Sequence, residues 1–258
     1  MHSKYYTVTV APDINHGAAT GTATSDGDLL FDWTPFEIPK GAAAICSIST
    51  QVFGVDGADA NGEDLMLYFA KSIDGVAPTS LGTTHAAPTA ATTTPSRKNI
   101  ISVRFFDQNT LSDNGGLLGY NIWRDLGAQL DTGKIILQGD MKYASTEGYQ
   151  TLWIGGVCSV SNGIFNFDTS IASNEADSAN VAANMTGASV TLVTSGTDPR
   201  NVFAPGDKAV GSTGGPTMEV VSVDGATGMT VKNISEQLDN AEIINPLNPI
   251  IFTFGFEY

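Results

Sequence analysis

The sequence predicts an all-β protein, built as an antiparallel β-sandwich of jelly-roll kind with a small β-barrel-like module inserted near the C-terminus. Three observations predict this class. The last ten residues, 249–258, alternate large apolar and mixed side chains, and residues 4–10 alternate in the same way. Between these two ends, further alternating segments recur, separated by Gly-rich or Asp-rich turns. Strands at such regular spacing are typical of sandwiches and barrels.

The C-terminal segment is the strongest strand signal. One face carries four large apolar groups and a tyrosine: Ile250, Phe252, Phe254, Phe256 and Tyr258. The opposite face is mixed, with Ile251, Thr253, Gly255 and Glu257. Burial of one such aromatic side chain stabilises a fold by roughly 1.5–3 kcal/mol. We therefore expect this strand to close the core.

The remaining elements follow from local pattern. Segment 29–38 is an edge strand, or two short strands around a bend, because Pro35 cannot donate a backbone hydrogen bond. Segment 65–70 is apolar on both faces and should be a central strand covered on both sides. In segment 100–106 we expect Ile101, Val103 and Phe105 to point inward. Other strands are predicted at 44–53, 120–123, 134–138, 151–160 and 164–167, and short helices at 174–185 and 235–243.

Residues 73–98 show no periodicity and are rich in Ala, Thr and Pro. Such a composition predicts a long surface excursion, with almost no large apolar residue to anchor it. We expect the part at 77–95 to be mobile, or to be ordered only by a neighbouring subunit.

A compact run of short strands with a Gly-bounded hairpin follows at 194–245. Because the strong strand at 249–258 comes after it, the sequence predicts a main sandwich domain of residues 1–193 plus 246–258, with 194–245 inserted. The alternative is a plain second domain that includes the last strand.

Charge excludes several functions. The formal net charge is -15, from 12 Lys and Arg against 27 Asp and Glu, which argues against nucleic acid and anionic membrane as partners. The chain shows no signal peptide or long apolar span, so we expect assembly in the host cytoplasm.

No catalytic, cofactor-binding or metal-ligating residues are predicted, and we expect no enzyme activity. Cys46 and Cys158 read as small buried thiols, with a disulfide left open. The acidic turn at 56–64 does not match a calcium loop and reads as a solvated hairpin tip, with calcium as the alternative. His2, His16 and His85 lie in polar loops, and the loop at 211–216 lacks a phosphate-binding ending.

The 27 acidic residues leave open a carboxylate pair for glycoside hydrolysis. Trp33, Trp123 and Trp153 form either core or a sugar platform.

Several segments resemble virion structural proteins of tailed phages, especially marine phages of cyanobacteria. Those in the later module are Pro-Gly-Asp at 205–207, Gly-Ser-Thr-Gly-Gly at 211–215 and Val-Ser-Val-Asp-Gly at 221–225. Those near the N-terminus are Tyr-Thr-Val-Thr-Val at 6–10 with the following Gly-Thr-Ala-Thr, Phe-Glu-Ile-Pro-Lys-Gly-Ala-Ala from 36 and Leu-Tyr-Phe-Ala-Lys at 67–71. The resemblance implies a head decoration or cement protein, located in the virion.

Our first hypothesis is therefore a non-enzymatic virion structural protein that binds and stabilises the capsid surface. Its partners would be the major capsid protein or another virion protein and further copies of itself. The alternative is a carbohydrate-binding or other tail- or fibre-associated adhesion module, and a secreted hydrolase is a third reading. Candidate docking strands are 33–36 and 5–10.

Overall fold

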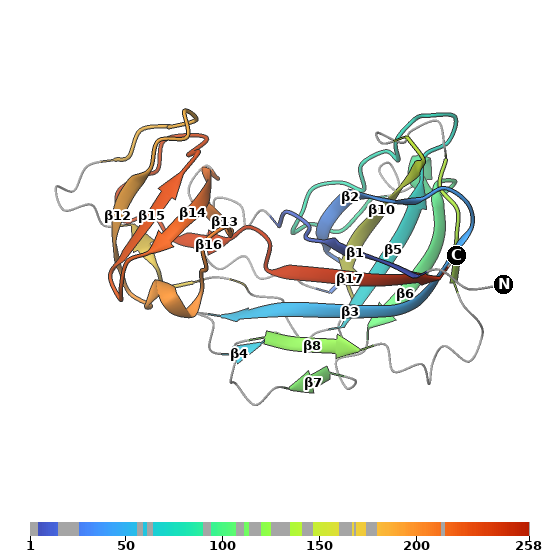
Figure 1. Ribbon diagram of the computed structural model, residues 1–258, viewed down its shortest axis with the longest axis horizontal. Coiled ribbons are helices and arrows are strands. Elements are labelled where there is room, and N and C mark those ends of the chain that lie inside the picture. The colour runs from blue at the N-terminus through green and yellow to red at the C-terminus, as the bar shows by residue number, and fades with distance from the viewer. Residues whose placement is uncertain are drawn as a thin grey trace.

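The computed structural model describes most of the chain. The described residues are 5–14, 26–55, 59–60, 64–89, 94–106, 111–113, 120–124, 135–140, 147–159, 167, 169–173, 180–212 and 215–257. The protein is all-β, as expected, and its strands form three antiparallel sheets. Two sheets form a sandwich on one side of the molecule, and the third lies beside it, joined through β3 and β17 (Figure 1).

The first sheet is built around the C-terminal strand. Strand β17 lies between β1 and β3, with Phe254 opposite both Val8 and Ile48. The other edge of β3 pairs with β8, β9 and β4, and β8 pairs with β7. The strands are β1 (Tyr5–Val10), β3 (Ala43–Val55), β4 (Asp59–Ala60), β7 (Leu111–Asp113), β8 (Tyr120–Arg124), β9 (Ile135–Leu137) and β17 (Ile250–Glu257).

The second sheet has the order β2-β10-β5-β6. Its strands are β2 (Leu29–Pro39), β5 (Leu65–Lys71), β6 (Ile100–Phe106) and β10 (Tyr149–Cys158). The edge position expected for the Pro35 segment is confirmed, because β2 pairs with β10 alone among the described strands. Gly156 is required in β10, because a Cβ there would lie 2.3 Å from the ring of Phe31.

The aromatic row of β17 joins the two sheets of the sandwich. Phe252, Phe254 and Phe256 are fully buried, as predicted. They meet rings from the second sheet: Phe252 lies 5.8 Å from Phe31, and Phe254 lies 5.5 Å from Phe36 and 5.6 Å from Phe69, measured between ring centroids. The core cluster of the sandwich therefore forms where the C-terminal strand faces β2 and β5.

The third sheet has the order β11-β12-β15-β14-β13-β16 and its own core cluster. Its elements are β11 (Ala172–Ser173), β12 (Val190–Ser195), the 3-10 helix η3 (Pro199–Asn201), β13 (Lys208–Gly211), β14 (Thr217–Val223), β15 (Gly228–Lys232) and β16 (Ile244–Pro246). The sheet thus contains most of the expected module at 194–245 but starts earlier, at Ala172. The last strand, β17, belongs to the first sheet.

The two predicted helices are wrong where the structure describes them. Val181 bridges to Leu238 and Asn184 bridges to Ile234, so the two segments meet at isolated bridges, and neither 180–185 nor 235–243 is helical. These pairings override the modest helix propensity of the two segments. Residues 174–179 lie outside the described part of the chain, as do residues 164–166 of the strand expected at 164–167.

The excursion after β5 is ordered by its own sheet, which corrects the expectation of a mobile or subunit-ordered loop over its described residues, 77–89 and 94–95. The backbone N–H of Leu81 donates to Asp32 Oδ1 at 2.9 Å, and Trp33 Nε1 donates to the Thr79 carbonyl at 2.9 Å. Leu81 is 4% exposed, and a Cβ on Gly155 would lie 2.8 Å from its side chain. The excursion therefore covers the outer face of β2 and β10.

Strand β6 follows its predicted alternation only at Ile101, which packs against the sandwich core, and departs from it at Val103 and Phe105. A register shift between Phe69 and Ala70 leaves Ile101 as the extra residue of a bulge. Beyond the bulge, Phe106 is buried, whereas Val103 is 45% and Phe105 44% exposed. The outer face of β5 is likewise only partly covered, since Met66 and Tyr68 are half-buried. The expected full cover of β5 is therefore wrong.

Candidate functional site

In the described part of the chain, the residues considered for metal binding or catalysis do not come together in one site. Of the acidic turn at 56–64, only residues 59, 60 and 64 are described. Among the described residues there is no group of three or more His, Cys, Asp or Glu side chains placed to hold a metal ion. His2 and His16 lie outside the described residues. His85 has a positive φ of 60° and donates its backbone N–H to the Leu29 carbonyl.

The two cysteines are separate free thiols. Cys158 is buried, as predicted, but Cys46 is exposed, which corrects that prediction. The register of β3 against β17 shifts at this point, from Ser47–Gly255 to Ile45–Phe256, so that Cys46 is the extra residue of a bulge. Its Sγ lies 3.3 Å from the Gly255 carbonyl oxygen.

Trp33 and Trp153 do not form an exposed platform for a sugar ring. Trp153 is 4% exposed, and Trp33 is half-buried with its indole nitrogen bonded to Thr79. The side chain of Trp123 lies outside the described residues. In the docking patch expected at 33–36, Phe36 is part of the sandwich core and Trp33 donates to the excursion, while the strand itself lies at a sheet edge, so docking there stays a prediction.

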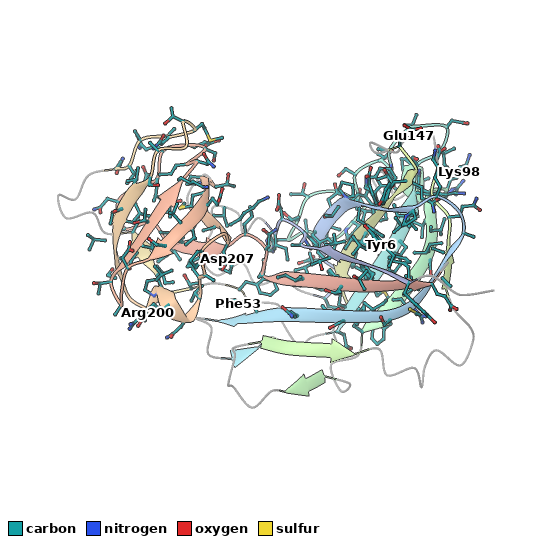
Figure 2. All side chains as sticks on the ribbon, viewed as in Figure 1. Tyr6, Phe53, Lys98, Glu147, Arg200 and Asp207 are labelled. Carbon is teal, nitrogen blue, oxygen red and sulfur yellow. The ribbon has the colours of Figure 1, made fainter. Side chains whose placement is uncertain are left out.

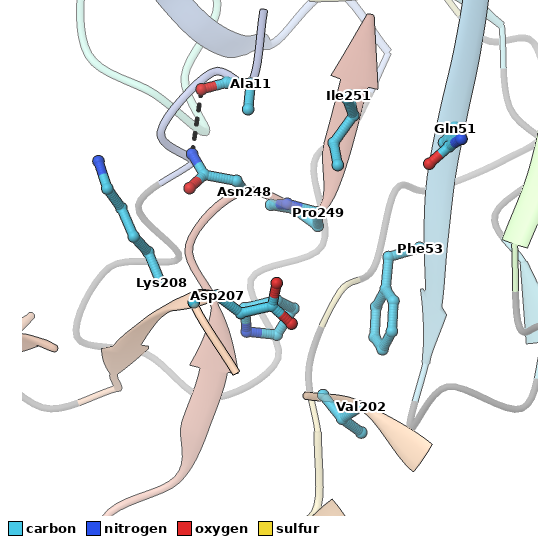
Figure 3. Close-up of a pocket in the computed structure, with 11 residues that line it drawn as sticks. Ala11, Gln51, Phe53, Val202, Asp207, Lys208, Asn248, Pro249 and Ile251 are labelled. Carbon is cyan, nitrogen blue, oxygen red and sulfur yellow. Dashed lines mark hydrogen bonds between the residues drawn. The ribbon is translucent and has the colours of Figure 1, made fainter. Parts of the chain in front are cut away.

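A cavity of about 230 Å³ lies where the third sheet meets the sandwich (Figure 3). Phe53 of β3 and Val202 both line it, and both belong to the core of the third sheet. Asn248 Nδ2, also at this cavity, donates to the carbonyls of Ala11 and Pro12 at 3.1 and 2.9 Å. The Asn248 side chain therefore links the segment before β17 to the segment that follows β1. This polar contact at the cavity has a structural role.

Lys208 lines both this cavity and a second one of about 320 Å³. Asp207 and Glu219 line one cavity each, and the carboxylates are engaged. Asp207 Oδ2 accepts the Ala204 N–H at 2.7 Å, and Glu219 Oε1 lies 2.8 Å from Lys232 Nζ. The acidic groups that line the two cavities are thus engaged in contacts within the protein (Asp207 is labelled in Figure 2).

Hydrogen bonds lower the pKa of three carboxyls in and beside the third sheet. The hydrogen bond from Lys232 is the main cause of the lowered pKa of Glu219. Hydrogen bonds from Thr230 and then Ser222 lower the pKa of Asp224, and Arg200 lowers that of Asp198. In each case a hydrogen-bond donor stabilises the ionised form of the carboxyl, which lowers its pKa. These contacts tie neighbouring strands or a turn, which is a structural role.

Three of the eight large apolar side chains that are exposed in the described part of the chain lie on strands at the ends of the sandwich sheets, and sequence reasoning located them only in part. Tyr5 on β1 is 70% exposed, and β1 pairs with β17 alone among the described strands. The docking strand expected at 5–10 therefore lies at a sheet edge, and its docking stays a prediction. Val103 and Phe105 on β6 form a second such place, which the simple alternation of 100–106 had assigned to the core. The outward direction of Val103 and Phe105 follows from the bulge at Ile101, which the sequence pattern does not show.

No helix among the described residues is both long enough and apolar enough to span a membrane. No protein-family model matches the chain. No curated protein matches it either.

Among solved structures, a chain in "Structure of infectious bursal disease virus Gx strain" aligns with a TM-score of 0.24 and 10% sequence identity. The alignment covers 100% of this chain and 41% of the viral chain, so this chain spans less than half of that length. A likeness this distant does not define the fold or the role of the chain.

Proposed function

We propose that this protein is a non-enzymatic structural component of a virus particle, which binds the capsid surface and stabilises it as a decoration or cement protein. The resemblance of its sequence to virion proteins of tailed phages first suggests this role. The structural observation that supports it most is the exposure of large apolar groups on strands at the ends of both sandwich sheets, Tyr5 on β1 and the pair Val103 and Phe105 on β6.

Such edges suit attachment to another protein. An edge strand offers unpaired backbone N–H and C=O groups, and apolar groups beside it add contact area that loses water on binding. Carboxylates are costly to bury unpaired, so an acidic protein docks best through patches that lack them. The net charge of -15 keeps copies soluble at high local concentration before they are placed on the particle.

The packed contact between the sandwich and the third sheet suits the same role. Phe53 leaves the sandwich on β3 and is buried in the core of the third sheet, and its backbone N–H donates to the Pro249 carbonyl at 2.8 Å. A cement protein holds neighbouring shell subunits at a fixed spacing, and packing between its two parts helps to keep that spacing. The partners proposed are the major capsid protein or another virion protein, and further copies of this chain.

The experiment is quantitative mass spectrometry of purified particles, in which this chain is counted against the major shell protein. A copy number near that of the shell subunit is expected. Particles stripped of the protein should also rupture at a lower temperature and recover when it is added back. Absence of the chain from purified particles would overturn the proposal, and a handful of copies would replace the cement role with a vertex, tail or fibre position.

A further inference from the structure

Strand β6 is the last strand of its sheet among the described strands, and β9 of the first sheet lies close to part of it without pairing. It pairs with β5 along Leu65–Phe106 to Ala70–Ile100, and with no other strand that the structure describes. The hydrogen-bonding groups on its far side are thus directed away from the sheet. An edge of this kind takes up an extended segment as an additional strand.

The outer face of this edge is apolar. The register sets Phe105 opposite Met66 and Val103 opposite Tyr68, and all four side chains share one face. Val103 and Phe105 are almost half exposed, while Met66 and Tyr68 are half-buried beneath the same face. A strand added beside β6 would continue this surface with its own outward side chains.

The same segment is basic in an acidic protein. Residues 94–106 contain Arg97, Lys98 and Arg104 and no Asp or Glu, whereas the whole chain has a net charge of -15. Arg97 and Lys98 are exposed just before β6 (Lys98 is labelled in Figure 2), and neither side chain has an ion pair with a described residue. The sign of the local charge is thus opposite to that of the molecule.

Arg104 provides the most specific feature. Val103 and Phe105 face outward, so Arg104 points to the opposite face, where it is half-buried opposite Leu67. Its Nε is buried and has no hydrogen-bond partner. An unsatisfied buried donor costs roughly 1–3 kcal/mol, and a carboxylate is the strongest acceptor that a partner strand can bring to a guanidinium.

We propose that the β6 edge binds an extended acidic segment of another protein as an added strand. The segment alternates: apolar side chains lie beside Val103 and Phe105, and carboxylates face Arg104 and the cations that precede β6. A second copy fits poorly, because pairing β6 with β6 brings like charges together on adjacent strands. This inference rests on the proposed role in a protein assembly and names the chemistry of one contact.

The test uses three labelled nine-residue peptides with valine at alternate positions and with Glu, Ser or Lys at the others. Fluorescence anisotropy with the full protein should show binding of the Glu peptide about tenfold or more tighter than that of the Ser peptide, because charge complementarity favours it. The Lys peptide should not bind. Absence of binding by the Glu peptide at millimolar protein, or equal binding of all three peptides, overturns the proposal.

Variants locate the contact. Val103→Asp and Arg104→Gln should each weaken the Glu peptide severalfold, with the wild-type unfolding midpoint retained. The matched control is Val193→Asp, since Val193 is 43% exposed on the third sheet. Equal weakening by Val193→Asp would show that the peptide binds elsewhere. Sedimentation of the free protein completes the test, because a dimer abolished by Val103→Asp would assign the edge to a second copy.

The two proposals fail separately. If the protein binds the Glu peptide at β6 but is absent from particles, the virion role is wrong and the docking surface stands. If the protein is abundant in particles but does not bind the Glu peptide, the docking surface is wrong and the virion role stands.

Discussion

Phe254 of β17 stacks on Phe36 of β2, with ring centroids 5.5 Å apart and ring planes inclined by 24°. This contact bridges the two sheets of the sandwich at its centre, and Phe69 meets the same ring from β5 at 5.6 Å. The C-terminal strand thus holds together elements from the first third of the chain.

Substitution of Phe254 by alanine should therefore be severe. We expect Phe254→Ala to lower the free energy of unfolding by about 3–5 kcal/mol, because it leaves a cavity in a fully buried aromatic cluster. The matched control is Phe105→Ala, where the ring is 44% exposed and the loss should be about 0.5 kcal/mol. Urea denaturation measures both values, and similar losses at the two sites would contradict the described core.

The excursion should depend on Leu81. We expect Leu81→Ala to lower the free energy of unfolding by about 2 kcal/mol and to raise backbone hydrogen exchange across 77–89, because its side chain packs on Gly155 under the hydrogen bonds to β2. Val76→Ala, at a residue that is 67% exposed in the same excursion, is the control. Fast exchange of 77–89 in the wild-type protein would show instead that the segment is not docked.

Acid should release the link between β14 and β15. The pKa of Glu219 is lowered from its ordinary value of 4.5, chiefly by the hydrogen bond from Lys232. A carboxyl with a lowered folded-state pKa stabilises the protein above its unfolded pKa, and that contribution disappears as pH falls through the folded pKa. The difference in thermal midpoint between wild-type protein and Glu219→Gln should thus shrink from about pH 6 to about pH 3.

Lys232→Gln serves as the companion variant for that pair. It should reproduce the effect of Glu219→Gln at neutral pH, and the double variant should add little, because both remove one contact. Additive effects would mean that the 2.8 Å ion pair contributes nothing in solution.

The two thiols should react at different rates. Cys46 is exposed and Cys158 is buried, so a thiol reagent should label one cysteine quickly in the folded protein and the second only in denaturant. Cys46→Ser should abolish the fast phase, and Cys158→Ser should leave it intact. Two fast phases, or none, would contradict the bulge that turns Cys46 outward.

Local periodicity determined much of the sandwich. In β17 the side chains alternate in sequence, and every second one is buried, because both neighbouring strands keep the register that the pattern needs along Ile250–Gly255. The same reasoning located β1, β3 and β10 and placed β2 at an edge beside Pro35. A strand with one apolar face reports its own orientation, since its side chains point alternately to the two sides of the sheet.

Tertiary structure decided what depends on distant partners. The bulge opposite Phe69 and Ala70 turned Val103 and Phe105 to the surface and created the candidate docking edge, although residues 100–106 read as an inward-facing strand. The bridge between Val181 and Leu238 holds two segments of helical composition in a non-helical conformation. Leu81 became an anchor only because Trp33 and Gly155 shape its place. Register shifts and cover are properties of two segments together, so neither segment encodes them in its own pattern.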